Sequence, residues 1–135
     1  MKKLLLILLL FVGIGINTTY AQIYRYQTTC FAIKQVNSYG YWGEWSNWEP
    51  SDMLITLNFD KSLVKIYSPI TQTYIIKEYI GSYNDNGGGA QAEYKFVDQD
   101  GDIGILRLRI DNNGNSQIYI EFNNIMWVYG VKRIY

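Results

Sequence analysis

Apolar and polar residues alternate with a period of two along most of the chain after Ser51. Segment 53–59 is the simplest case, because its odd-numbered residues are all large and apolar, while Leu54, Thr56 and Asn58 stand between them. Such alternation is typical of a β-strand that buries one face. It predicts that this segment is a half-buried strand.

The same pattern recurs in six further segments, separated by short turns rich in Asn, Asp, Gly and Ser, and the longest of these connections is 81–89. With one strand in the N-terminal third, the predicted strands are 23–36, 53–59, 63–68, 71–80, 90–96, 103–110, 117–122 and 126–135. Because strands joined by short turns usually pair, we expect an all-β fold, an eight-stranded antiparallel up-and-down β-barrel without free edges. A two-sheet β-sandwich is the alternative.

The last predicted strand, 126–135, is apolar on both faces. Met126 and Val128 fall on one face, and Trp127 falls on the other. A strand that is apolar on both sides is expected to be covered on both. We therefore expect the segment 38–50 to pack over its outer face.

The beginning of the chain has the pattern of a cleaved secretory signal peptide. Two lysines precede an apolar run at 4–12, and Thr19 and Ala21 fit the −3 and −1 positions of a cleavage site. A membrane anchor is disfavoured, because the run is shorter than the roughly 20 residues that cross a bilayer. We expect residues 1–21 to be a signal peptide and residues 22–135 to be one domain that is periplasmic or secreted and not embedded in a membrane.

Composition narrows the range of functions. Once the two lysines of the signal peptide are removed, ten basic residues stand against twelve acidic ones, without a basic block, which argues against nucleic-acid binding. The chain has no histidine and one cysteine, which removes histidine-based nucleophile pairs, histidine-ligated zinc and an intrachain disulfide. We therefore predict a protein that is not an enzyme and needs no cofactor. The single cysteine, Cys30, has strand-forming neighbours and is expected in the core.

The most unusual segment is 39–49, which holds three tryptophans at a spacing of three. Exposed aromatic rings beside polar groups suit sugar rings, because the apolar ring face stacks while the polar groups bind hydroxyls. If this segment lies at the barrel mouth, the candidate ligand-binding residues are Tyr41, Trp42, Glu44, Trp45 and Trp48. Alternatively, the tryptophans plug one end of the barrel or pack on its outside, since tryptophan is usually well buried.

Carboxylates offer two further candidates. The segment Asp98 to Asp102 places oxygen ligands at alternate positions, as calcium loops do, but Ile103 and Arg109 stand where an EF-hand loop needs glycine and a carboxylate. We therefore expect a plain hairpin turn and no metal site. Six other carboxylates could supply an acid–base pair for glycoside hydrolysis, although no spacing singles out a pair; they are Glu44, Glu49, Asp52, Glu78, Glu93 and Glu121.

Gly43, Glu44 and Trp45 stand near the start of the predicted meander, and Arg133 stands in its last strand. This arrangement resembles the Gly-x-Trp motif of calycin-like β-barrels of the lipocalin and avidin type, in which a basic residue of the last strand packs on the tryptophan. The resemblance implies a barrel whose interior binds a small apolar ligand. It covers the strand plan, the tripeptide and the arginine, whereas a strand precedes the motif here and the C-terminal helix of lipocalins is missing.

Two functions remain open. The leading hypothesis is an exported, non-enzymatic binding domain that takes a small apolar molecule or a glycan in the barrel mouth or interior. The alternative is a protein–protein interaction or inhibitor module, with a filled barrel and an exposed aromatic patch. Whether the barrel is hollow discriminates between them.

Overall fold

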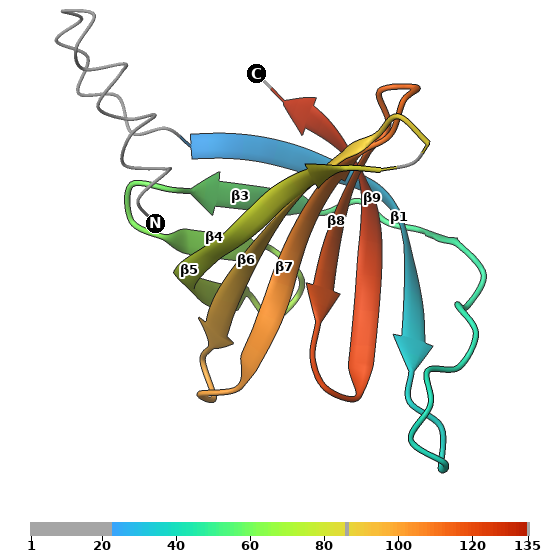
Figure 1. Ribbon diagram of the computed structural model, residues 1–135. Coiled ribbons are helices and arrows are strands. Elements are labelled where there is room, and N and C mark those ends of the chain that lie inside the picture. Colours follow the sequence, from blue (N-terminus) through green and yellow to red (C-terminus); the bar gives the residue numbers. More distant parts are fainter. Residues whose placement is uncertain (1–22, 86, 135) are drawn as a thin grey trace, which may run out of the picture.

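The computed structural model describes residues 23–85 and 87–134, and over these residues the chain consists of β-strands joined by turns and loops. The strands are β1 (Ile23–Gln35), β2 (Glu49–Pro50), β3 (Leu54–Asn58), β4 (Leu63–Ile66), β5 (Gln72–Asn84), β6 (Ala90–Asp98), β7 (Ile103–Ile110), β8 (Ser116–Glu121) and β9 (Ile125–Ile134). They form one sheet in the order β2-β1-β3-β4-β5-β6-β7-β8-β9 (Figure 1). The predicted signal peptide, residues 1–21, lies outside the described residues.

The double pairing of β1 closes this sheet into a barrel. Residues 23–27 of β1 pair antiparallel with β3, and residues 25–35 pair antiparallel with β9. The predicted closed antiparallel barrel of eight strands is therefore confirmed for the described residues, in place of the two-sheet sandwich. The two-residue strand β2, which pairs with β1 at Cys30 and Phe31, was not predicted.

The barrel interior is filled by the apolar set of each alternating strand. In β3, Ile55 and Leu57 are almost completely buried, as the alternation predicts. The buried core cluster consists of Ile55, Leu57, Val64, Ile66, Tyr74, Ile76, Tyr94, Phe96, Leu106, Ile118, Ile120, Tyr129 and Val131. Full burial of one such side chain contributes about 1.5–3 kcal/mol, so this cluster is the main source of stability.

Strand β5 extends further than the sequence pattern predicts. The predicted strand ends at Ile80, but β5 continues to Asn84 and pairs with β6 from Tyr74 to Asn84. Two register shifts, after Ile76 and after Tyr79, mark β-bulges that bend the strand around the barrel. The prediction of a loop over 81–89 is therefore wrong at its start, because each bulge interrupts the alternation from which a strand is recognised.

Both faces of β9 are covered from Met126 to Val131, as predicted, whereas residues 132–134 are exposed. Tyr129 faces the interior, whereas Met126 and Val128 lie on the outer face with only 8% and 2% of their surfaces exposed. Trp45 packs edge to face on Tyr119, the partner of Val128 on β8, with ring centroids 6.2 Å apart. The segment after β1 therefore contributes to the outer cover of the barrel.

Cys30 lies outside the core cluster, so its predicted place there is wrong. A β-bulge between Thr28 and Cys30 shifts the alternation of β1, so that Thr28 and Phe31 face the interior and Cys30 faces outward opposite Gly130. The thiol is half-buried there. A Cβ atom on Gly130 would lie 2.6 Å from its Sγ, which shows how closely the two strands pack.

Candidate functional site

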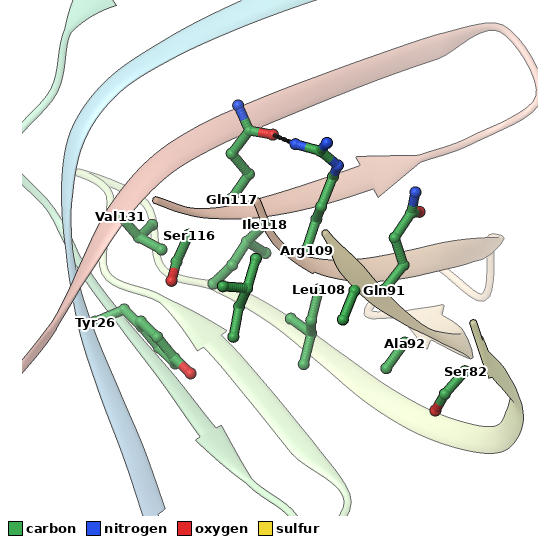
Figure 2. Close-up of a pocket in the computed structure, with 12 residues that line it drawn as sticks. Tyr26, Ser82, Gln91, Ala92, Leu108, Arg109, Ser116, Gln117, Ile118 and Val131 are labelled. Carbon is green, nitrogen blue, oxygen red and sulfur yellow. Dashed lines mark hydrogen bonds between the residues drawn. The ribbon is translucent and has the colours of Figure 1, made fainter. Parts of the chain in front are cut away.

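A cavity of about 300 Å³ opens at the end of the barrel where β5 turns into β6 and β7 turns into β8 (Figure 2). It is lined by Tyr26, Ser82, Ala90, Gln91, Ala92, Leu108, Arg109, Ile110, Ser116, Gln117, Ile118 and Val131. Figure 2 shows Arg109 and Gln117 pointing away from Leu108 and Ile118. The space is therefore the inside of one barrel mouth, lined by inward-facing side chains and by the backbone of the outward-facing ones.

Small side chains create this cavity. Two rows of register partners face the interior at this end, and they are Ser82–Ala92–Leu108–Ile118 and Asn84–Ala90–Ile110–Ser116. An eight-stranded barrel is just wide enough for its own side chains to fill it. Alanine and serine at four of these eight positions leave space that larger residues would occupy.

Aromatic rings fill the barrel beyond the cavity. One chain of ring contacts, with centroids 5.4–5.8 Å apart, runs through Tyr24, Phe59, Tyr94 and Tyr79. A second chain, at 4.7–5.8 Å, runs through Tyr74, Phe96, Phe122 and Trp127. Burial raises the pKa of Tyr94 to about 12, so this phenol, two residues deeper than Ala92, is neutral at ordinary pH. The interior beyond the cavity is therefore packed with aromatic rings.

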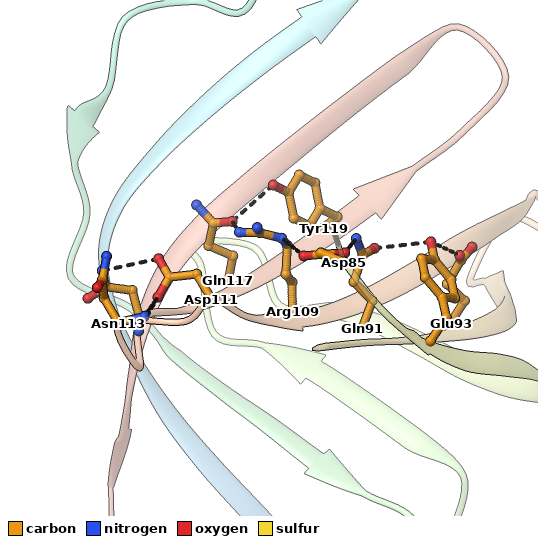
Figure 3. Close-up of polar contacts among 10 residues, drawn as sticks. Asp85, Gln91, Glu93, Arg109, Asp111, Asn113, Gln117 and Tyr119 are labelled. Carbon is orange, nitrogen blue, oxygen red and sulfur yellow. Dashed lines mark hydrogen bonds and ion pairs between the residues drawn. The ribbon is translucent and has the colours of Figure 1, made fainter. Parts of the chain in front are cut away.

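The charge nearest to the cavity is held outside it. Among the described residues that line the space, Arg109 alone is charged. Its Nε donates to Asp85 Oδ2 at 2.9 Å and its Nη1 donates to Gln117 Oε1 at 3.3 Å, while Gln91 also donates to Asp85 (Figure 3). This ion pair fixes the β5–β6 turn against β7 at the rim and leaves apolar atoms and hydroxyls inside, which suits an uncharged ligand.

Two of the six candidate carboxylates meet on the outer surface rather than in a cleft. Arg107 Nη2 lies 3.3 Å from Glu121 Oε1 and 3.8 Å from Glu93 Oε2, and its guanidinium lies over the ring of Tyr119. Tyr83 also donates a hydrogen bond to Glu93. These contacts are those of a surface ion-pair network, and neither carboxylate lines the cavity.

The five predicted ligand-binding residues lie apart from this cavity. Val36 and Trp42 form a bridge at the base of a hairpin that projects from the opposite end of the barrel (Figure 1). Trp45 then folds back on the outer face, with Lys34 Nζ 5.1 Å from its ring centroid. The exposed residues of this aromatic segment, 39–48, include Tyr41, Trp42, Glu44, Trp45 and Trp48. None of these five lines the cavity of about 300 Å³.

Arg133 and Trp45, which carry the resemblance to calycin-like barrels, do not line the cavity either. The Arg133 guanidinium lies over the ring of Tyr24, 4.8 Å from its centroid. Trp45 contacts Lys34 and Tyr119 instead. The arginine and the tryptophan that the resemblance would pair thus have different partners in this chain.

The loop from Asp98 to Asp102 has the geometry of a hairpin turn with a glycine bulge. Asp98 Oδ1 accepts hydrogen bonds from the backbone N–H groups of Asp100 and Asp102, and Gly101 has a φ of +86°. The loop that starts at Asp111 has the same two contacts and a glycine at the same place, with φ +84°. These contacts lower the pKa of Asp111, and the hydrogen bond from the Asn115 backbone is the largest cause.

Carboxylate oxygens of Asp98, Asp100 and Asp102 lie within 4.8 Å of one another. The hairpin-turn geometry explains the position of Asp98 without a bound ion. The loop that starts at Asp111 adopts the same geometry, with asparagine at the positions that correspond to Asp100 and Asp102.

Comparisons with protein families, with curated proteins and with solved structures gave no match. Within the described ranges, the structure contains no helix of the length and hydropathy needed to cross a membrane.

The sequence carried a signal for the cavity that alternation alone does not reveal. Ala90 and Ala92 occupy inward positions of β6, which continues inward with Tyr94 and Phe96. A change from small to large residues along one face predicts space at one end. The partners across the sheet, Ser82 among them, are found only once the bulges of β5 are known.

Proposed function

We propose that this protein is an exported, non-enzymatic binding domain that takes a small apolar molecule in the barrel-mouth cavity. The observation that carries the proposal is a cavity of about 300 Å³ with a mostly apolar lining. A cavity of roughly 150 Å³ accommodates benzene, so twice that volume accommodates about a dozen non-hydrogen atoms. A bicyclic ring or a ring with a short substituent has this size. Export rests on the signal-peptide pattern of residues 1–21.

The lining favours an apolar molecule over a glycan in this cavity. Leu108, Ile118 and Val131 offer no hydrogen-bonding side chains, and a sugar ring needs several to replace the water bound to its hydroxyls. The hydroxyl of Ser82 is already paired with that of Tyr79. A glycan would fit the aromatic segment 39–48 instead.

The test is binding of 2-naphthol, a neutral bicyclic probe, by calorimetry and by fluorescence titration. Ala92→Phe places a ring inside the cavity and is expected to weaken binding at least about tenfold, since the ligand and the ring compete for one space. Ile105→Phe is the matched control, because it adds a ring to the outer face of β7 next to Lys95. Equal binding by the wild type and Ala92→Phe, or no binding by the wild type, would count against the proposal.

A second candidate function is protein–protein interaction through the aromatic segment. Tyr39 and Tyr41 are 84% and 72% exposed, and Trp48 is 52% exposed. Exposed tyrosine and tryptophan are favoured anchors of interfaces. Crosslinking in the native host tests this, with Tyr39→Ser/Tyr41→Ser as the variant that should lose the partner. Retention of the same crosslinked partner by the variant would exclude this surface, and a glycan array probed with Trp48→Ala separates sugar binding from protein binding.

A further inference from the structure

A second concave site lies on the outer surface of the barrel, over β1, β3 and β4, with a volume of about 320 Å³. Its charged lining residues are Arg25, Lys61 and Lys65, and its lining also includes Leu54 and Leu63. We call it the outer groove. Every charge that lines it is positive.

These charges are not balanced by the protein itself. Over residues 23–85 and 87–134, no carboxylate forms an ion pair with Arg25 or Lys65. The arginines on the outer face of β7 differ in this respect, since Arg107 and Arg109 each contact at least one carboxylate. The outer groove therefore brings together three basic side chains, of which Arg25 and Lys65 form no ion pair with a described carboxylate.

The strand register brings two of these cations to one point. Arg25 pairs with Thr56 on β3, and Thr56 pairs with Lys65 on β4, so the three form one row across the sheet. Neighbouring strands are about 4.8 Å apart, which puts the Cα atoms of the two basic residues about 10 Å apart on either side of the threonine. Both long side chains can reach an acid group placed over Thr56, whose hydroxyl lies on the same face.

The groove also offers apolar surface beside this row. Leu54 lies two residues before Thr56 on β3, whereas Leu63 on β4 pairs with Asn58, two residues after Thr56, so the two leucines share the outer face and flank the basic row on opposite sides. Lys61 lies on the Leu63 side, in the turn between β3 and β4, so the Leu54 side is the less charged of the two. A ligand that fits this part of the groove therefore has one acid group and one apolar part.

We propose that the outer groove binds a free anionic amphiphile, in which a carboxylate, sulfate or phosphate group carries a short apolar chain or ring. The acid group lies over Thr56 between Arg25 and Lys65, and the apolar part lies on Leu54, on the side of the row away from Lys61. A free molecule fits better than a bilayer, because the site is a bounded hollow that a flat membrane surface does not enter. The proposal is independent of the barrel-mouth cavity.

The test is a titration of the ¹⁵N-labelled protein with octyl sulfate, followed by amide chemical shifts. We expect the shifts to concentrate in 23–27, 54–58 and 63–66, and the affinity to fall with salt. Lys65→Gln and Arg25→Gln should each weaken binding by about threefold to fivefold, the range for partly exposed ion pairs. Lys77→Gln is the matched control, because Lys77 is an exposed lysine on β5 outside the groove.

Three control probes make the result decisive. Octyl glucoside should bind far more weakly, and equal binding would show that the acid group is not recognised. Inorganic sulfate should bind far more weakly, and equal binding would show that the apolar part contributes nothing. Binding to phosphatidylglycerol vesicles that depends on Lys65, without binding of monomeric octyl sulfate, would overturn the free ligand in favour of a membrane surface.

The variant Ala92→Phe separates this proposal from the proposed function. Octyl sulfate shifts in the outer groove should persist when the barrel-mouth cavity is filled. Their loss in Ala92→Phe would place the amphiphile in the cavity and overturn the inference, while leaving the cavity as a binding site.

Discussion

Gly104 is the position where one added methyl group tests the packed end of the barrel most directly. It faces the interior on β7, opposite Phe96 of β6. A Cβ atom there would lie 2.4 Å from Phe96 Cζ and 2.6 Å from the carbonyl oxygen of Glu121. Carbon atoms in contact are normally about 3.5–4.0 Å apart, so the ring must move by more than about 1 Å.

The ring has no free space into which it could move. Phe96 is 0% exposed, and its ring contacts those of Tyr74 and Phe122 at centroid distances of 4.7 Å and 5.4 Å. Overpacking a core costs about 1–3 kcal/mol. The Cβ atom would also clash with the backbone carbonyl oxygen of Glu121, which cannot move as a side chain can. We therefore expect Gly104→Ala to lower the free energy of unfolding by about 2–4 kcal/mol.

The control is Gly81→Ala, because a Cβ atom there meets no atom within 4 Å. Alanine restricts the unfolded chain, so this variant should be neutral or stabilised by up to about 1 kcal/mol. Urea unfolding followed by tryptophan fluorescence measures the free energy of unfolding of both variants. In thermal unfolding, their melting temperatures should differ by about 10 °C or more. Phe96→Leu should cost less in the Gly104→Ala background than alone. If Gly104→Ala is as stable as Gly81→Ala, the interior at this end is looser than the contacts indicate.

Three further predictions concern the buried phenol of Tyr94, the ion pair between Asp85 and Arg109 at the cavity rim, and the contact between Cys30 and Gly130. Burial raises the pKa of Tyr94 to about 12, whereas an unfolded phenol titrates near about 10; stability should therefore be full below pH 10 and fall as the pH rises toward 12. Tyr94→Phe should make this fall shallower in urea unfolding, and an unchanged slope would contradict the assignment. Asp85→Ala should cost about 1–2 kcal/mol, because its arginine partner on β7 loses its carboxylate, and amide exchange should quicken in the β5–β6 turn; unaltered exchange would mean that the ion pair does not hold the rim. Gly130→Ala should destabilise the protein, because the new Cβ would lie 2.6 Å from Cys30 Sγ; Cys30→Ala should recover part of the loss, and strict additivity of the two changes would argue against the contact.

The fold was predictable where each strand obeys its own alternation. In β3 the period of two runs without interruption, and Ile55 and Leu57 are buried as expected. The errors concern Cys30 and the segment 81–84, which follow β-bulges in β1 and β5. A bulge is fixed by how a strand must bend to pair with both neighbours, and this is a property of the closed barrel rather than of local sequence.

The candidate site was less predictable than the fold. The aromatic segment 39–48 attracted attention because its residue types are rare, yet the cavity is made by residues as ordinary as Ala92 and Ser82. Ser82 and Ala92 form the cavity because they pair across β5 and β6, and this pairing depends on the strand register. The outer groove has the same origin, since Arg25 and Lys65 are 40 positions apart in the chain and share one row.

Residue size changes along the barrel axis, from small side chains at the cavity end to large ones at the opposite end, and this difference is consistent with a binding role for the cavity. A large apolar side chain buried at Ala90, Ala92 or Ser116 would contribute about 1.5–3 kcal/mol, and the opposite end of the same strands shows that this chain fills its interior where it can. Small residues at these positions forgo that stability. Stability is commonly forgone where a binding or catalytic site needs space. Among the described residues that line this space, Arg109 alone is charged, and it is paired with Asp85. An apolar space of this size suits the small apolar molecule proposed as its ligand.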